Sequence, residues 1–126
     1  MRDLTRAEEE VMQVLWQLKK GFVKDILEHF DDPKPAYNTV STIVRILQDK
    51  GFVDHKAYGR THEYFPLVSK DEYSKSHLST FVNDYFSNSF GKMVSFFAKE
   101  KEISVKEMED IMKIMEGEVK KQKTER

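Results

Sequence analysis

The chain has 126 residues and a mass of 14.9 kDa, enough for one ordinary domain or two small modules and too few for a barrel or a dinucleotide-binding enzyme. Its 21 basic and 22 acidic residues give a net charge of −1, which excludes a uniformly basic surface but allows a local basic patch. The absence of cysteine excludes disulfides, thiolate zinc sites and a cysteine nucleophile. Without a signal-peptide pattern or an apolar run of about 20 residues, we expect a cytoplasmic protein with no membrane insertion.

Three short helices are predicted in the first part of the chain. Thr5 and Glu8 have capping-box spacing at the start of a helix over about 5–18, and apolar residues follow at helical spacing. A second helix of about two turns follows Gly21 and ends before Pro33. A third covers about 36–50 and stops at Gly51, a residue suited to a left-handed cap.

A β-hairpin is predicted directly after the third helix. Residues 52–56 alternate between apolar and polar, residues 57–60 contain a glycine turn, and residues 61–65 favour strand. Three helices followed by a hairpin is the element order of a winged helix. Ser69, with Glu72 three positions on, then opens a new helix through a second capping box. We therefore expect a winged-helix DNA-binding domain at 1–68 and a helical dimerisation domain at 69–126.

Residues 69–126 predict three amphipathic helices with more apolar side chains than so short a segment buries alone. Ser104 and Glu107 form a capping box for the last of them. A partner surface is therefore implied. Its candidate residues are Leu78, Phe81, Val82, Tyr85 and Phe86 in the first helix, Phe90, Met93, Val94 and Phe97 in the second, and Met108, Ile111, Met112 and Met115 in the third.

The polar side of the third helix is a candidate DNA-reading face. It is small at its start and carries Arg45 and Gln48 further along, so the helix could approach a groove closely. Residues 33–62 carry a net charge of +3, whereas residues 1–32 carry −3. Any surface helix is polar on one side, and a loop arginine is often merely solvated, but the position before a hairpin favours DNA binding. The candidate residues are Asn38, Thr39, Ser41, Thr42 and Arg45 on the helix and Arg60 at the hairpin tip.

No catalytic pattern stands out. The sequence has no phosphate loop, no GxSxG and no HExxH. Asp54-His55 and His62-Glu63 could face each other across the hairpin and hold a metal, but solvent-facing neighbours are the commoner arrangement. We therefore expect no enzyme activity, no metal and no cofactor.

Several segments, in this order and spacing, carry a family resemblance: Leu4–Trp16, Asn38–Thr42, Lys50–Lys56, Gly59-Arg60, Tyr64–Val68 and Phe90-Gly91. They resemble the penicillinase-repressor family of winged-helix transcriptional repressors. The resemblance implies a homodimer in which the winged helix reads a palindromic operator and the C-terminal helices form the three-helix dimerisation segment. It also implies that the start of the third helix enters the major groove, while the wing contacts the backbone.

Family operators often lie in the repressor's own promoter, beside a gene for a transporter or a membrane-bound metalloprotease sensor, which makes a sensor protease a candidate partner. In the β-lactam-responsive branch the repressor is cleaved at an Asn-Phe bond. The aligned candidate cleavage position here is Phe96-Phe97, without the Asn. Ile46 also stands where the family commonly has Arg, and the paired Cys-x-Cys motifs of copper-responsive members are missing.

Two alternatives stay open beside the repressor. A winged-helix protein-interaction module would use the polar helix face on a protein instead of DNA. An effector-binding regulator would hold a small molecule among its Phe- and Met-rich C-terminal helices. All three hypotheses share one fold class, mainly α with a small β-hairpin wing.

Overall fold

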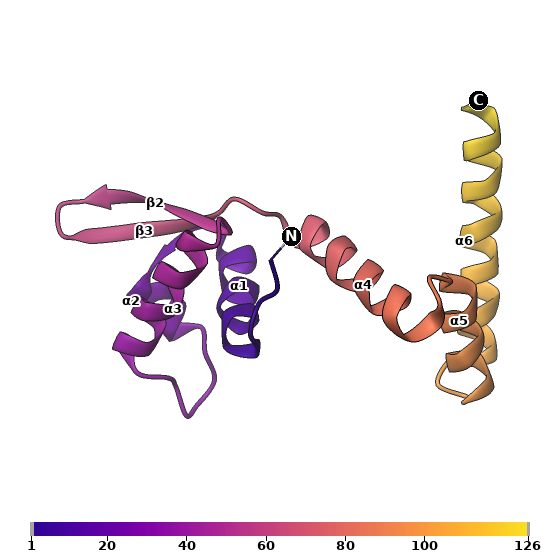
Figure 1. The fold of residues 1–126 in the computed structure, drawn as a ribbon, viewed down its shortest axis with the longest axis horizontal. Helices are drawn as coiled ribbons and strands as arrows, with labels where there is room; N and C mark the ends of the chain where they lie inside the picture. The colour runs from indigo at the N-terminus through magenta and orange to yellow at the C-terminus, as the bar shows by residue number, and fades with distance from the viewer. Residues whose placement is uncertain (1, 126) are drawn as a thin grey trace. The chain divides into compact units, whose positions relative to one another are not determined.

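The computed structural model describes residues 2–125, which form six helices and three short strands (Figure 1). The chain divides into two compact units, the first ending at Leu78 and the second beginning at Ser79. This confirms the predicted fold class, mainly α with a hairpin wing. In chain order the elements are α1 (Arg6–Leu18), β1 (Gly21–Phe22), α2 (Val23–Glu28), α3 (Tyr37–Asp49), β2 (Val53–Tyr58), β3 (Thr61–Pro66), α4 (Lys70–Phe86), α5 (Phe90–Lys99) and α6 (Val105–Thr124).

Local capping sets the helix starts of the first unit. Thr5 Oγ1 accepts from the Glu8 backbone N–H at 3.2 Å, and Glu8 Oε1 accepts from the Thr5 N–H at 2.9 Å, as the capping-box pattern predicts. At α2, the Phe22 N–H donates to Asp25 Oδ2 at 3.0 Å, an equivalent cap that the sequence analysis did not identify. Gly51 ends α3 at φ +84°, the left-handed conformation expected there.

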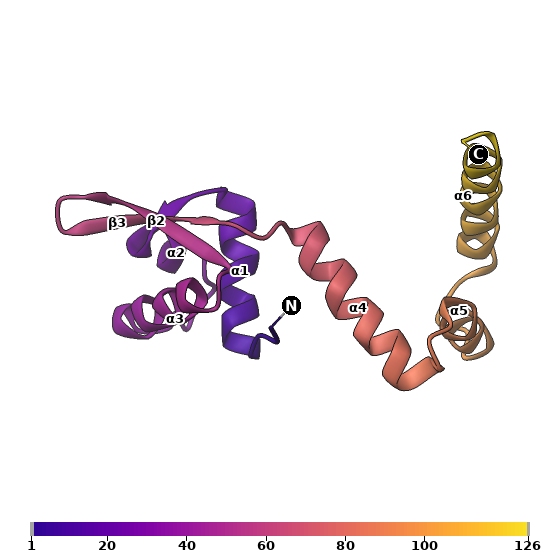
Figure 2. The same ribbon diagram turned by 45° about the horizontal axis from the view of Figure 1, so that its top comes forward.

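The wing is the β2–β3 hairpin, and its turn contains Gly59 at φ +64°. In Figures 1 and 2 the hairpin extends beyond α2 and α3. The antiparallel sheet has the order β1-β3-β2, so β3 lies in its centre. Strand β1 was not predicted, because two residues are too short for any periodicity to be visible.

The core of the first unit lies where α1, α2, α3 and the sheet meet. Three residues of α3, Val40, Val44 and Leu47, are fully buried in it, as are Met12 and Leu15 of α1. Burying an apolar side chain contributes roughly 1.5–3 kcal/mol. This stripe therefore fixes which side of α3 faces solvent.

The first unit continues past the expected boundary near residues 67–69. Helix α4 begins at Lys70, where the predicted capping pair is present, with Ser69 Oγ accepting from the Glu72 N–H at 3.0 Å. Tyr73, in the first turn of α4, is only 8% exposed and belongs to the core of the first unit. This packing explains why the compact unit reaches Leu78. The division into functional domains stays a prediction.

The second unit buries little of its apolar surface. Val82 is fully buried, and Phe86 packs between the rings of Phe81 and Phe96 at 5.9 and 5.7 Å. Ser104 caps α6 as predicted, accepting from the Glu107 N–H. Most of the other predicted partner-surface residues are exposed or half-buried, with Tyr85 at 73% and Met112 at 61%.

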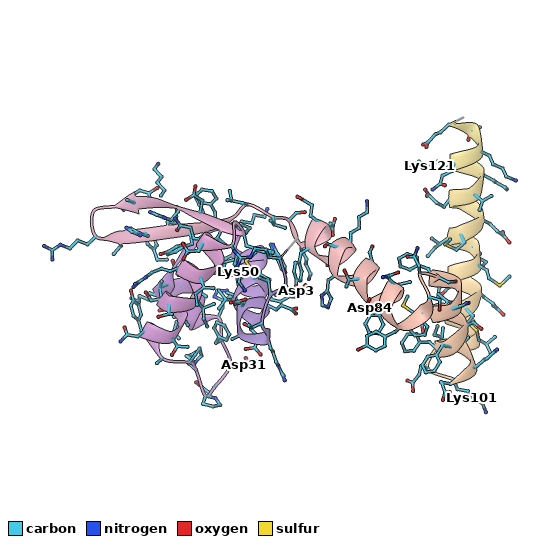
Figure 3. All side chains as sticks on the ribbon, viewed as in Figure 1. Asp3, Asp31, Lys50, Asp84, Lys101 and Lys121 are labelled. Atoms are coloured by element: carbon cyan, nitrogen blue, oxygen red, sulfur yellow. The ribbon has the colours of Figure 1, made fainter. Side chains whose placement is uncertain are left out.

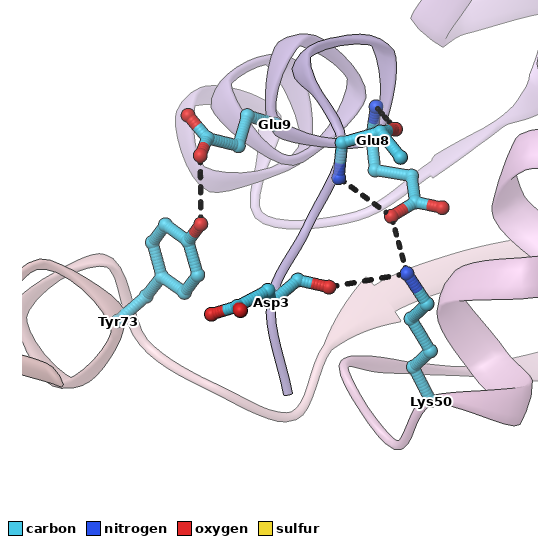
Figure 4. Close-up of polar contacts among 6 residues, drawn as sticks. Asp3, Glu8, Glu9, Lys50 and Tyr73 are labelled. Carbon is cyan, nitrogen blue, oxygen red and sulfur yellow. Dashed lines mark hydrogen bonds and ion pairs between the residues drawn. The ribbon is translucent and has the colours of Figure 1, made fainter. Parts of the chain in front are cut away.

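An ion pair joins the end of α3 to the start of α1 (Figure 4). Lys50 Nζ lies 2.6 Å from Glu8 Oε1 and also donates to the Asp3 carbonyl oxygen at 3.2 Å. Both side chains are largely buried. Burial by itself raises the pKa of Glu8, but the hydrogen bonds from Lys50 and Thr5 outweigh it and hold the pKa below its ordinary value of 4.5. The ionised carboxylate thus stabilises the folded state.

We expect Glu8→Gln to lower the free energy of unfolding at neutral pH by about 1–3 kcal/mol, because it leaves a largely buried ammonium without its counter-charge. Since the folded-state pKa is depressed, the contribution of Glu8 is present above pH 4.5 and is lost as the pH falls through the folded-state value. As the pH falls below 4.5, the free energy of unfolding should therefore decrease less in Glu8→Gln than in the wild type. Urea unfolding followed by the single tryptophan, Trp16, measures both effects.

The control is Glu10→Gln, because Glu10 forms an exposed i,i+4 pair with Arg6. It should change stability by less than about 0.5 kcal/mol. Equal effects of the two substitutions would contradict the role assigned to the ion pair.

Candidate nucleic-acid interface

The outward side of α3 carries all five helical residues predicted to bind DNA. Four of them are exposed, while Ser41 is half-buried. The opposite stripe of α3, Val40, Val44 and Leu47, is buried in the core. The polar face can therefore turn inward only if these core contacts are broken. The exposed residues are Asn38, Thr39, Thr42 and Arg45.

Two side chains on this face are bonded along the helix. Thr42 Oγ1 donates to the Asn38 carbonyl oxygen at 2.9 Å, and Arg45 Nη2 donates to Ser41 Oγ at 3.2 Å. The Arg45 guanidinium is thereby held beside the preceding turn, with further N–H groups available for an acceptor. The face therefore offers small groups at its start and an oriented cation near its end.

Gln48 connects α3 to the wing. Its Oε1 lies 2.8 Å from His55 Nδ1, and the His55 ring stacks on His62 at 4.1 Å between centroids. His55 thus contacts α3 through Gln48 and contacts the neighbouring strand through His62. Within residues 2–125 no cluster of three or more metal-ligating side chains is found.

A groove of about 750 Å³ lies between the start of α2, the face of α3 and the hairpin. Of the six residues predicted to bind DNA, it brings together Ser41 and Arg45 of α3 and Arg60 of the hairpin tip. Asn38, Thr39 and Thr42 are not among its lining residues. It also contains Lys24 and Tyr37, which the sequence analysis missed. The lining residues are Phe22, Val23, Lys24, Asp25, Tyr37, Ser41, Arg45, Arg60, Thr61, His62 and Tyr64.

The two missed residues have different explanations. Lys24 was counted with the acidic segment 1–32, and only the pairing of β1 with β3 brings it beside the hairpin. Tyr37 is the first residue of α3. It was missed because the sequence analysis singled out small polar side chains at the start of this helix, and tyrosine is large and aromatic. Its spacing of four residues from Ser41 and eight from Arg45 places Tyr37 on the same side of α3 as both, which is the signal that could have found it.

Tyr64 provides an uncharged surface in this groove. It is only 5% exposed, and this burial raises the pKa of its hydroxyl, with the positive charge of Arg45 acting in the opposite direction. The ring therefore stays neutral. Lys24, Arg45 and Arg60 supply positive charge to the groove against the one carboxylate of Asp25.

The second unit has a hollow of about 520 Å³ on α5, and this hollow bears on the effector alternative. Its lining is mostly small or charged, and Phe96 is the one aromatic residue among Ser89, Gly91, Lys92, Ser95, Phe96 and Lys99. It does not match the Phe- and Met-rich pocket expected of an effector regulator. Phe96-Phe97 lies inside α5 with both rings exposed, and cleavage there stays a prediction that requires part of the helix to unwind.

The Penicillinase repressor family model matches residues 4–117. The chain belongs to this family. Methicillin resistance regulatory protein MecI of Staphylococcus aureus (strain N315) is 26% identical over 114 residues, covering 90% of this chain and 93% of that protein. The penicillinase repressor of Bacillus licheniformis is 25% identical over 114 residues, covering 90% of this chain and 89% of that protein.

Among solved structures, the chain is similar to the solution structure of the DNA binding domain of the repressor BlaI. The identity is 25% and the TM-score 0.49, with 58% of this chain and 94% of that chain covered.

Family membership confirms the resemblance found in the sequence. Members of the penicillinase repressor family are transcriptional repressors and not enzymes, so the prediction of a non-enzymatic repressor is also confirmed. Among residues 2–125 no helix has the length and apolar character needed to cross a bilayer.

Proposed function

We propose that this penicillinase repressor family member acts as a homodimer on a palindromic duplex operator in its own promoter. Helix α3 enters the major groove and the hairpin wing contacts the phosphate backbone. One observation supports this most strongly: Ser41 and Arg45 on the polar side of α3 line one groove with Arg60 of the wing. Repressors that read duplex DNA need base-edge contacts and phosphate contacts side by side. On α3 the exposed Asn38 and Thr42 are near neighbours of Ser41 in the helix, and Arg45 and Arg60 supply cations for phosphates.

The dimensions of α3 suit a major groove. Its 13 residues span about 20 Å, and a helix with its side chains is about 10–12 Å wide, close to the width of the major groove. The residues at its start, Asn38 and Thr39, have short side chains, which allow the helix backbone to approach base edges closely. Arg45, further along, is long enough to reach a phosphate or a guanine.

A second copy of the chain is the proposed occupant of the apolar faces of the second unit. Large exposed side chains occur on all three of its helices, including Tyr85, Phe90 and Met112. Large exposed apolar side chains in this number mark an interface, and a self-complementary surface closes with two-fold symmetry. A two-fold dimer matches a palindrome whose half-sites lie one helical turn apart, about 34–36 Å.

Salt dependence tests the phosphate contact of the wing. The operator is a duplex that the wild type selects from a random-sequence pool, and its affinity should fall steeply with salt because phosphate contacts release counterions. Arg60→Ala should flatten the slope of log affinity against log salt by about one unit. The control, Lys121→Ala on α6 (Figure 3), should leave the slope unchanged.

An unchanged slope for Arg60→Ala would remove the wing from the proposed contact. If the wild type selected no duplex at all, the protein-interaction alternative would replace the operator proposal.

Base reading by α3 is tested with operators that carry single base-pair changes. Asn38→Ala should abolish discrimination at one position of each half-site, a loss of about 1–3 kcal/mol, because a base-edge hydrogen bond is removed. Lys56→Ala, an exposed cation of the hairpin, should weaken all the duplexes equally. A uniform loss for Asn38→Ala, measured by fluorescence anisotropy across the panel, would contradict base reading by Asn38.

Dimerisation is tested on α6, where Met112 is exposed and its replacement leaves the core of the protomer intact. Met112→Asp should weaken self-association at least about tenfold, because it places an unpaired carboxylate in the apolar interface. Lys113→Asp adds a carboxylate about 100° further around the same helix and should have a smaller effect. Sedimentation equilibrium measures both variants, and a monomeric wild type would contradict the proposal.

A further inference from the structure

The first turn of α4 is built into the first unit by aromatic packing. Tyr73 lies among the rings of Trp16, Phe52 and His77, at centroid distances of 5.8, 5.8 and 5.6 Å. Trp16 comes from α1, and Phe52 directly precedes β2. The ring of Tyr73 therefore contacts separate parts of the winged helix.

Two hydrogen bonds add direction to this packing. Tyr73 Oη donates to Glu9 Oε1 at 2.7 Å (Figure 4), and Trp16 Nε1 donates to the Val68 carbonyl oxygen at 2.9 Å. One bond holds the first turn of α4, and the other holds the segment just before it. Burial and the Glu9 carboxylate both raise the pKa of the Tyr73 hydroxyl, which keeps it protonated as a donor.

Helix α4 continues without interruption from this anchor into the second unit. Its 17 residues include no glycine and no proline, and the boundary between the units, Leu78 to Ser79, falls inside it. Helices of such composition resist sharp bending. The contacts of Tyr73 therefore hold the first turn of this continuous helix against the winged helix.

We propose that Tyr73, bonded to Glu9, is a positioning residue that makes the spacing of the two operator half-sites a fixed property of the repressor. The inference rests on the proposed function, since it concerns a dimer bound to a palindrome. We call the contacts of Tyr73 with Glu9, Trp16 and Phe52 the clamp. In the proposed dimer, the clamp sets the orientation of each winged helix relative to the start of α4, the helix that leads to the dimerisation segment. When the clamp is loosened, the dimer accepts half-sites at several spacings.

The test uses full-length protein on the selected operator and on versions with one or two base pairs added or removed between the half-sites. The wild type should lose about tenfold or more in affinity at the altered spacings, because the two half-sites can no longer be bound together. Tyr73→Phe and Glu9→Ala, which each remove the hydrogen bond, should reduce that loss to about two- to threefold. Affinity for a duplex with a single half-site should stay within about twofold of wild type.

Two controls separate positioning from stability. Glu9→Gln keeps an oxygen acceptor for the Tyr73 hydroxyl and should restore the wild-type spacing preference. Glu10→Ala removes the neighbouring carboxylate, which is paired only with exposed Arg6, and should preserve that preference.

A wild-type spacing preference in both Tyr73→Phe and Glu9→Ala would overturn the inference and leave the proposed function standing. So would a large loss of single half-site affinity in these variants, which would assign Tyr73 a merely structural role. Failure of the wild type itself to distinguish a palindrome from a single half-site would instead overturn the proposed function.

Discussion

The burial of one stripe of α3 is the constraint on which the rest of the molecule depends. Val40, Val44 and Leu47 fill the space between α1 and the sheet, and none of them has measurable exposure. Three buried aliphatic side chains contribute several kcal/mol between them, far more than any single polar contact on the other face of the helix. The polar residues of α3 therefore face solvent, because the burial of the apolar stripe fixes the rotation of the helix about its axis.

The first turn of α1 binds residues from two other helices of the first unit. Glu8 pairs with Lys50 at the end of α3, and the adjacent Glu9 accepts from Tyr73 at the start of α4. Consecutive residues on a helix point about 100° apart, so these neighbours can bind partners from two different directions. The first turn of α1 thus contacts both the end of α3 and the start of α4.

This arrangement explains why the acidic start of the chain coexists with a basic groove. The carboxylates of Glu8 and Glu9 are occupied by internal partners, while Lys24, Arg45 and Arg60 face the groove. The net charge of residues 1–32 is negative, so it does not reveal that Lys24 of this segment lies in the groove. In the folded chain the groove is lined by three cations and by one carboxylate of that segment, Asp25.

Much of the first unit could be predicted from the sequence because its signals are local. The capping pairs at Thr5 and Ser69 and the glycines at 51 and 59 each determine the backbone within a few residues. What escaped prediction depends on contacts between distant residues. Strand β1 exists only through its pairing with β3, and the burial of Tyr73 in the first unit requires Trp16 and Phe52 to be already assembled. No pattern within α4 itself reveals that contact.

The second unit shows the opposite situation. Its helices could be predicted from the periodicity of their apolar residues. Most of these residues are nevertheless exposed or half-buried, since one copy of so short a segment is too small to form a core that covers them. The partner cannot be read from the pattern of one chain. In the proposed dimer, a two-fold copy of the chain supplies both the missing packing surface and a second α3 for the duplex.

The stoichiometry of the complex with the selected operator tests this account most directly. Sedimentation velocity of the full chain with the duplex at moderate salt gives the mass of the assembly. Two chains should bind each palindromic duplex in one step, without a populated complex of one chain. A complex that saturates at one chain per duplex would contradict the proposed dimeric repressor.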